Sequence, residues 1–382
     1  MANLFIIGNG FDLANNLKTS YDDFRTFLLD NYVHVKRARS IKVPQLRRGA
    51  LDVTINEAAV FIYRIISQTE GLLWRDVEHA LGEIDYTLLF EETNDFNNYQ
   101  DTILGLACSL SKVQFLFEDW ITNINEEEVC TLKKFESLIN PYEDLFVTFN
   151  YTDLLEAEYG AKKVCHIHGT RNGDIIFGHG NTQRLRIVSN NENKKSNTFQ
   201  RKNRKGRKKS DDKHDFNIKK ESYTKLLSIN YLTLDDISMI MQCIPVKTLL
   251  YSKLWDIQQL LLRSQRNIIK TQKDYNNENG TFLQIEEALE KIHSMLHKDT
   301  NSALQRLAQF IGMNMPQSID CIYSIGFSFS LVDMKAIQLI DMIPHTAWSI
   351  DSFNINLAQK YRKELIHLGN NKHNIHIESL LR

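Results

Sequence analysis

Polar side chains and glycines follow five short apolar segments of this chain, at the point where each predicted strand ends. In an open parallel sheet the carboxyl ends of the strands meet at one edge, and ligands bind in the crevice beyond that edge. Five such ends are a stronger indication of a site than any single one. In chain order, Asn9 and Asp12 follow the first strand, and Asn150 and Asp153 follow the second. The third strand is followed by His166, His168 and Gly169, the fourth by Gly178, His179 and Asn181, and the fifth by Gly326, Ser328 and Asp333.

The first of these ends is a glycine turn, Gly8-Asn-Gly10, between a predicted strand and a predicted helix. Glycine lets the backbone fold tightly and approach a ligand closely. Free amide groups in such a turn and at a helix N-terminus can bind phosphate, so the turn predicts a nucleotide-type site. The dinucleotide fingerprint has a third glycine where this chain has Leu13, and a tight turn without a ligand is the alternative.

Two histidines, His166 and His168, lie two residues apart and would face the same side of a strand. Such a pair is a half-site for a metal ion. One imidazole could instead act as a general base, because it titrates near neutral pH. Both could also be structural residues at the sheet edge. Of the two, His168 is the sharper candidate, because Gly169 would leave room for a substrate beside its ring.

Asn150 lies in the segment Thr148-Phe-Asn-Tyr-Thr-Asp153. Its amide can both donate and accept hydrogen bonds, which suits contact with ribose hydroxyls or the orientation of a water molecule. Asn150 or Thr152 could instead start the next helix, over Asp-Leu-Leu-Glu, so a helix cap is the alternative.

Trp74 and Glu78 are four residues apart and would share one face of a helix. The indole could cover a base or a nicotinamide ring, and the carboxylate could bind a hydroxyl group. A core aromatic residue beside a solvated acid is the alternative.

Composition restricts the class of protein. The chain is 42% hydrophobic and 24% charged, as in ordinary globular proteins, and its formal net charge of −1 provides no global attraction to nucleic acid or membranes. No apolar run approaches the roughly 20 residues that span a bilayer. The five cysteines are scattered and form no Cys-x-x-Cys pair, which predicts a reducing, cytoplasmic location and argues against a structural zinc site.

Strand-like segments alternate with helical blocks, which predicts an α/β fold with a largely parallel, Rossmann-like sheet and large helical insertions. A helix is expected over residues 21–32, capped by Thr19 or Ser20, and mostly helical periodicity extends over 51–138. The predicted strands are residues 4–7, 145–149, 164–168, 175–177, 321–325, 347–350 and 375–377.

These elements divide the chain into a core and three insertions. We expect a nucleotide-binding core from residues 1–50, 140–183 and 315–382, a helical insertion over 51–139, a basic and mobile insertion over 184–221, and a second helical region over 222–314. The basic run 201–209 could neutralise nucleic-acid phosphates. It has no interleaved aromatic residues to stack on bases, which favours a solvated loop.

The motifs together resemble the AbiH family of bacterial phage abortive-infection proteins. The resemblance begins at Phe5-Ile-Ile-Gly-Asn-Gly-Phe-Asp-Leu-Ala14 and Thr19-Ser-Tyr-Asp-Asp-Phe24, and continues through Trp74-x-x-x-Glu78 and Phe146-Val-Thr-Phe-Asn-Tyr-Thr-Asp153. It extends through His166-Ile-His-Gly169 and Ile176-Phe-Gly-His-Gly180 to Ile325-Gly-Phe-Ser-Phe-Ser-Leu-Val-Asp333. In the last motif we expect a histidine where this chain has Phe327, so no role is transferred to that position.

AbiH sequences in turn are distantly similar to sirtuin-like NAD-binding domains, which implies NAD as the substrate and hydrolysis of its nicotinamide–ribose bond during infection. The resemblance implies Asn150 and His168 as catalytic residues. It implies contacts to the nucleotide from Gly8, Asn9, Gly10, Phe11, Asp12, Gly326 and Ser328, with Trp74, Glu78, Asp153, His166, His179 and Asp333 as further candidates. The chain lacks the four-cysteine zinc module of sirtuin deacetylases, so a plain hydrolase without a metal is favoured.

Two other functions stay open at this point. His166, His168 and His179, with Asp12 or Glu78, could bind a divalent metal in a nuclease or phosphoesterase. The nucleotide pocket could instead belong to a non-enzymatic sensor of a phage-encoded trigger. The expected partners are NAD or a related nucleotide, such a trigger and further copies of the chain, with nucleic acid possible through residues 201–209 and no membrane.

Overall fold

The computed structural model describes residues 2–45, 53–71, 73–89, 96–126, 128–180, 239, 289–314, 316 and 318–381. Within these residues a six-stranded, all-parallel sheet has the strand order β3-β2-β1-β4-β5-β6. This order is doubly wound and reverses between β1 and β4, which confirms the predicted α/β, Rossmann-like fold. The strands are β1 Ala2–Ile7, β2 Leu145–Thr148, β3 Val164–His166, β4 Ile319–Ile325, β5 His345–Asp351 and β6 Ile375–Glu378.

One predicted strand, residues 175–177, is wrong. The segment is buried, but it packs on a helix instead of joining the sheet: the Phe177 ring stacks on Phe117 of α6 (Val113–Thr122) with centroids 3.8 Å apart. An apolar run of three residues does not show whether its partner will be a strand or a helix.

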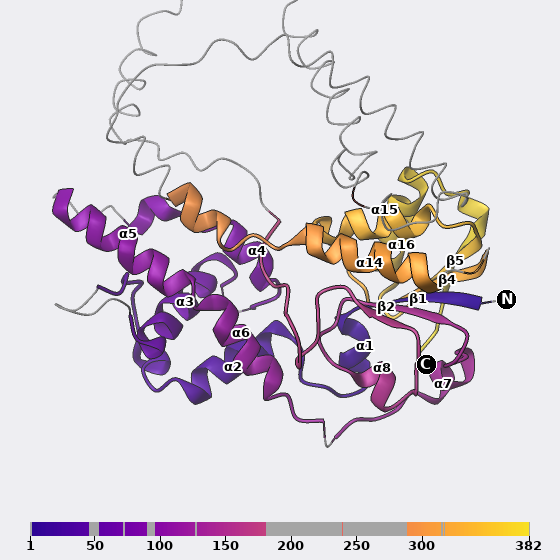
Figure 1. The fold of residues 1–382 in the computed structure, drawn as a ribbon. Coiled ribbons are helices and arrows are strands. Elements are labelled where there is room, and N and C mark those ends of the chain that lie inside the picture. Colours follow the sequence, from indigo (N-terminus) through magenta and orange to yellow (C-terminus); the bar gives the residue numbers. More distant parts are fainter. Residues whose placement is uncertain are drawn as a thin grey trace, which may run out of the picture.

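Helices cover both faces of the sheet (Figure 1). Helices α14 (Thr300–Asn314), α15 (Met334–Asp341) and α16 (Ile355–His367) lie on one face, and α1 (Asn9–Ala14), α7 (Lys133–Leu138) and α8 (Leu154–Ala157) lie on the other. Alternate residues of β1 therefore enter different cores: Leu4 and Ile6 pack on the α14 side, and Phe5 and Ile7 on the α1 side. Burial on both faces explains why β1 reads as an unbroken apolar run.

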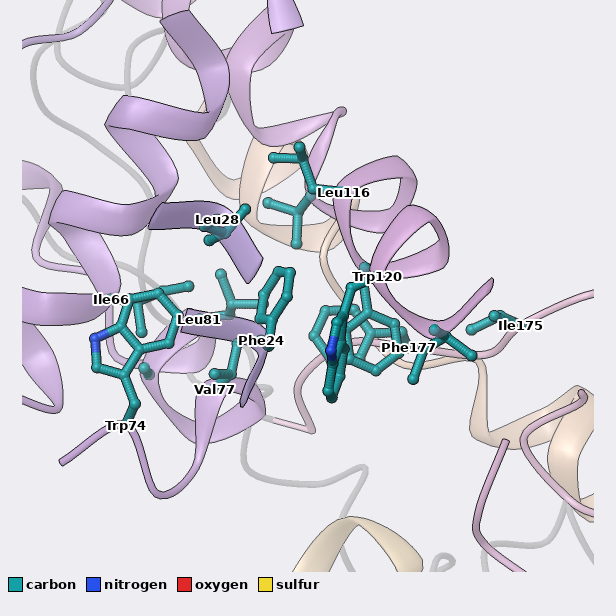
Figure 2. Packing of buried hydrophobic residues seen from close by; sticks show 14 of the residues in the cluster. Phe24, Leu28, Ile66, Trp74, Val77, Leu81, Leu116, Trp120, Ile175 and Phe177 are labelled. Atoms are coloured by element: carbon teal, nitrogen blue, oxygen red, sulfur yellow. The ribbon is translucent and has the colours of Figure 1, made fainter. Parts of the chain in front are cut away.

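A group of helices between β1 and β2 packs beside the sheet (Figure 1). It contains α2 (Tyr21–Asn31), α3 (Ile55–Thr69), α4 (Val77–Gly82), α5 (Phe96–Leu110) and α6. Helix α2 confirms the predicted helix over 21–32, and its cap is Ser20, whose hydroxyl accepts from the Asp23 amide in a capping box. The core of this group is aromatic and continuous with one face of the sheet; Figure 2 shows Phe24, Trp74, Trp120 and Phe177 within it.

Short 3₁₀ turns complete the described elements, at η1 (Val35–Arg37), η2 (Tyr86–Leu89), η3 (Leu331–Asp333) and η4 (Lys372–Asn374). The basic run 201–209 and nearly all of 222–288 lie outside the described residues, and the predicted division into domains stays a prediction. In the part of the chain that the structure describes, no helix has the length and apolar character needed to cross a bilayer.

Candidate active site

A cavity of ≈ 480 Å³ lies beyond the carboxyl ends of β1, β2 and β4, where helix α4 and the start of α2 approach the sheet. This is the switch point of the strand order, the position at which doubly wound proteins bind ligands. Most of the predicted site residues line it: Gly8, Asn9, Gly10, Asp12, Trp74, Glu78, Asn150, His168, Gly326, Ser328 and Asp333.

Two glycine turns form the floor of the cavity by packing against each other. A Cβ on Gly8 would lie 2.5 Å from the Phe327 Cα, and one on Gly10 would lie 2.7 Å from the Gly326 Cα. Gly326 also has a φ of +61°, which only glycine adopts readily. The glycines therefore allow the end of β1 to contact the end of β4.

The same packing uses two of the amides that we expected to face a phosphate. The Gly8 amide donates to the Ile325 carbonyl at 3.0 Å, and the Gly10 amide donates to the Gly326 carbonyl at 2.9 Å. The Asn9 side chain donates to the Thr19 carbonyl at 2.8 Å and ties the turn to the start of α2. The glycine turn thus holds the ends of β1 and β4 and the start of α2 together beside the cavity.

Asp12 is buried next to Asn150 and Thr152. Its Oδ1 accepts from the Asn150 amide at 2.7 Å, and its Oδ2 accepts from the Thr152 hydroxyl at 2.7 Å. Burial raises the pKa of the Asp12 carboxyl to about 7, although both of these hydrogen bonds act in the opposite direction. A carboxyl group with this pKa can hold or release a proton near neutral pH.

Asn150 does not cap a helix, because Asp153 holds the N-cap position of α8. The Asn150 Nδ2 donates one hydrogen to Asp12 and the other to the Gly8 carbonyl at 3.1 Å. Both partners are acceptors, so they fix the orientation of the amide. The carbonyl oxygen Oδ1 is then the atom through which Asn150 could contact a ligand.

Another wall of the cavity carries a network of charged side chains with little exposure to solvent. His168 Nε2 lies 3.1 Å from Asp333 Oδ1, and Lys298 Nζ lies 3.4 Å from the same oxygen. Lys298 Nζ also lies 3.0 Å from Glu78 Oε1. Lys298 and His168 are almost wholly buried, at 7% and 4% exposure, so their charge depends on these partners more than on water.

The partners decide the ionisation of each group in this network. Burial alone would raise the pKa of Asp333, but Lys298 and His168 hold it well below its usual range. Burial raises the pKa of Glu78, against the influence of Lys298. Burial would lower the pKa of Lys298, but Asp333 and Glu78 outweigh it and raise that pKa.

Four predicted residues lie away from the cavity. Phe11 is in the core, where its ring contacts Phe135. Asp153 forms an ion pair with Arg171 at 3.0 Å.

The two histidines of this group have other partners. His166 Nε2 lies 2.7 Å from Glu156, and His179 lies against two other histidines, at positions 293 and 297. Asn181 lies outside the described residues.

The expected pairing of His166 with His168 is wrong, because β3 ends at His166 and the chain turns before His168. Gly169 also has a different task from the one predicted: with φ +83°, a Cβ there would lie 1.7 Å from the Asp174 carbonyl oxygen. The glycine makes room for the protein backbone.

Trp74 and Glu78 do not share a helix face either. Helix α4 begins at Val77, and Trp74 precedes it with a φ of +41°. The Trp74 indole donates to the Ser67 hydroxyl at 3.1 Å and packs between Phe24 and Tyr63, as Figure 2 shows for Phe24. Trp74 is thus mainly a core residue, whereas Glu78 belongs to the site.

Lys298 and Thr152 are site residues that the sequence analysis missed. Lys298 lies 220 residues after Glu78, and no motif around it marks it as buried. Thr152 was noticed only as a helix start. His293 and His297 were missed as well, although a His-x-x-x-His spacing is a known pattern for metal ligands on a helix.

Comparison with known families agrees with the motifs that build this cavity. The family model of bacteriophage abortive infection AbiH matches residues 4–231, more than half of the chain. The chain belongs to the AbiH family. It is therefore a protein of bacteriophage abortive infection, and the matched range contains Asp12, Glu78, Asn150 and His168. The comparisons with curated proteins and with solved structures give no match.

Phe327, where we expected a histidine, belongs to this AbiH protein's aromatic wall of the cavity. Its ring lies 4.3 Å from that of Phe149, which in turn meets the His168 ring edge-on at 5.3 Å. An apolar contact therefore limits the movement of His168 on one side, while Asp333 holds its Nε2 on the other.

Proposed function

We propose that this AbiH protein hydrolyses the bond between nicotinamide and ribose in NAD and thereby stops growth of the infected cell. The observation that carries the proposal is that Asn150 and His168, which reach the site from different strand ends, line one cavity and are each hydrogen-bonded to an aspartate, Asp12 and Asp333. The resemblance to sirtuin-like domains that the sequence motifs suggest implies the same two residues.

The charge of the site favours such a reaction. With Glu78 and Asp333 ionised and Lys298 protonated, one negative charge remains beside His168. The nicotinamide ring of NAD is a cation, and its departure leaves an oxocarbenium-like ribose. As the bond breaks, the positive charge moves from the ring to the ribose, and a negative charge placed beside the ribose stabilises it there.

Asn150, His168 and Asp333 have separate roles in this reaction. The bond between ribose C1′ and the ring nitrogen breaks, and its electron pair leaves with neutral nicotinamide. A water molecule, held by Asn150 Oδ1, attacks C1′. Its proton passes to His168 Nδ1, since Nε2 is hydrogen-bonded to Asp333, which stabilises the resulting imidazolium.

Purified protein and NAD test the proposal, with nicotinamide release followed by chromatography. We expect His168→Ala and Asn150→Ala to lose at least ~100-fold in rate, the usual scale of a lost acid–base or positioning group. His373→Ala is the matched control, because this exposed histidine lies far along the chain in η4. Circular dichroism of each variant separates a lost activity from a lost fold.

The same variants in infected cells decide between enzyme and sensor. We expect NAD to fall on infection only where Asn150 and His168 are intact, and protection to be lost with them. Unchanged NAD in cells that remain protected would contradict the proposal. Protection that survives both substitutions would favour the sensor. Nucleic-acid degradation that chelators abolish, with NAD unchanged, would favour the metal-dependent nuclease.

A further inference from the structure

Three imidazoles meet outside the cavity described above. The ring of His179 lies 4.2 Å from that of His293 and 4.6 Å from that of His297, centroid to centroid. One ring nitrogen of each residue lies within 4.8 Å of the other two. In the described part of the chain, this is the one group of three or more His, Cys, Asp or Glu side chains close enough to share a metal ion.

Backbone hydrogen bonds bring the three residues together from distant parts of the sequence. The His179 amide donates to the Leu296 carbonyl at 2.9 Å, and the Lys298 amide donates to the His179 carbonyl at 2.9 Å. Gly178 permits this approach, since a Cβ there would lie 2.3 Å from the Leu296 carbonyl oxygen. Backbone contacts of the fold therefore hold the three histidines together.

The two ring nitrogens of His293 are placed as those of a metal ligand would be. The side chain is 4% exposed, and its Nδ1 lies 3.2 Å from the Tyr86 hydroxyl. Its Nε2 is buried and has no hydrogen-bond partner. A buried polar atom without a partner destabilises a protein, and a metal ion would satisfy this one.

The surroundings resemble the outer shell of a metal site. Ligating histidines normally hydrogen-bond through their second nitrogen, which fixes the ring and its tautomer. Here the Tyr86 hydroxyl is placed to do this for His293, and the backbone oxygen of His293 lies 3.3 Å from His179 Nε2.

We propose that His179, His293 and His297 bind a divalent transition-metal ion of the zinc type. Three imidazoles are a known ligand set for Zn²⁺, with a water molecule in the fourth position. In a tetrahedral site with metal–nitrogen bonds of about 2.1 Å the nitrogens lie ~3.4 Å apart, so the three rings need to close by about an ångström. A separate cavity of ≈ 260 Å³ reaches His297 and also contacts Asp299 and Arg306, which gives the ion and its water a path to solvent.

The metal would act on the neighbouring site through the chain. His297 is followed directly by Lys298, whose ammonium group joins Glu78 to Asp333. An ion bound to His297 therefore holds the segment that carries this lysine. The inference does not depend on NAD hydrolysis, because a metal can bind here whatever the cavity does.

The test uses the full chain, stripped of metal with a chelator and then given Zn²⁺ or Co²⁺. We expect one Co²⁺ per chain, with the visible absorption of a four-coordinate site, and a rise in melting temperature with one equivalent of Zn²⁺. Tyr86→Phe should weaken binding by about 10- to 100-fold, the usual effect of an outer-shell loss. His297→Gln should remove a ligand, and with it the absorption of bound Co²⁺.

His373→Gln is the control, because it removes an exposed histidine outside the cluster and should bind both ions as the unaltered protein does. If His297→Gln fails to fold, Tyr86→Phe still tests the site, since it leaves all three ligands in place. Absence of binding to the unaltered protein would overturn the proposal, as would equal binding by the unaltered protein and the two cluster variants.

Discussion

Two aspartates of the candidate active site have little exposure to solvent, yet their carboxyl groups behave in opposite ways. Asp12 has only neutral hydrogen-bond donors, Asn150 and Thr152, and burial raises its pKa to about 7. Asp333 lies beside Lys298 and His168, which hold its pKa below the usual range. Both carboxyl groups are largely removed from water, so the charge of the partners decides which one is ionised.

The difference assigns different tasks to the two walls of the cavity. Asp333 remains a carboxylate and can stabilise a protonated His168. Asp12 can be neutral or charged near pH 7 and orients Asn150 in either state. Enzymes often separate acid and base roles in this way, by giving similar side chains different environments.

The largest expected effect comes from removing the cation of the charged network, Lys298. Lys298→Met leaves Glu78 and Asp333, whose side chains are only 14% and 11% exposed, without their cation, so we expect a loss of about 3–5 kcal/mol in the free energy of unfolding. Urea denaturation at neutral pH measures it. Lys36→Met is the matched control: its partner Asp30 lies 3.0 Å away and both side chains are exposed, so little change is expected.

A smaller effect is expected from replacing Asp12 by a residue that does not titrate. The folded pKa of Asp12 lies above its ordinary value of 3.8, so the folded state binds a proton more tightly and this group's contribution to stability is greatest below about pH 4. That contribution falls by roughly 2–4 kcal/mol as pH rises through the folded pKa of about 7.

Asp12→Asn should remove this pH dependence, since the amide does not titrate and can still accept from Asn150. Unfolding free energies measured between about pH 4 and pH 8 would show a flatter profile than the unaltered protein, and Asp22→Asn, an exposed acid, should leave the profile as it was. A profile unchanged by Asp12→Asn would show that Asp12 is ionised throughout, and the contrast with Asp333 would be lost.

The smallest effect comes from one hydrogen bond. Thr152→Val removes the hydroxyl that donates to Asp12, which should raise the pKa of Asp12 further and lower stability by about 1–2 kcal/mol. The pKa can be followed by carboxyl NMR and the stability by thermal unfolding. Thr122→Val removes an exposed hydroxyl that donates to the Glu118 carbonyl, and its loss should be smaller.

Local sequence patterns predicted much of the fold. Six predicted strands, the helix over 21–32 and the parallel arrangement are confirmed, because apolar runs buried on both faces and a capping box are signals contained in a few neighbouring residues. The strand over 175–177 was wrong, since its burial depends on Phe117, a residue 60 positions away from Phe177.

The same limit applies to the site. Asn9, Asp12, Asn150 and His168 were found because each follows a strand, and the carboxyl ends of parallel strands share one edge. Lys298, His293 and His297 were not found, because they follow no strand of the sheet and reach their partners only through the packing of segments that begin near residue 178 and residue 293.

The sequence alone therefore determined the strands, their order of appearance, the polar residues at their ends and the family to which they point. Only the tertiary structure decided which of those residues meet and in what state of charge. The reason is physical: Glu78 and Lys298 are 220 residues apart, and Asp12 and Asn150 are 138 apart. The pKa of a buried group depends on such neighbours in space, which local patterns do not contain.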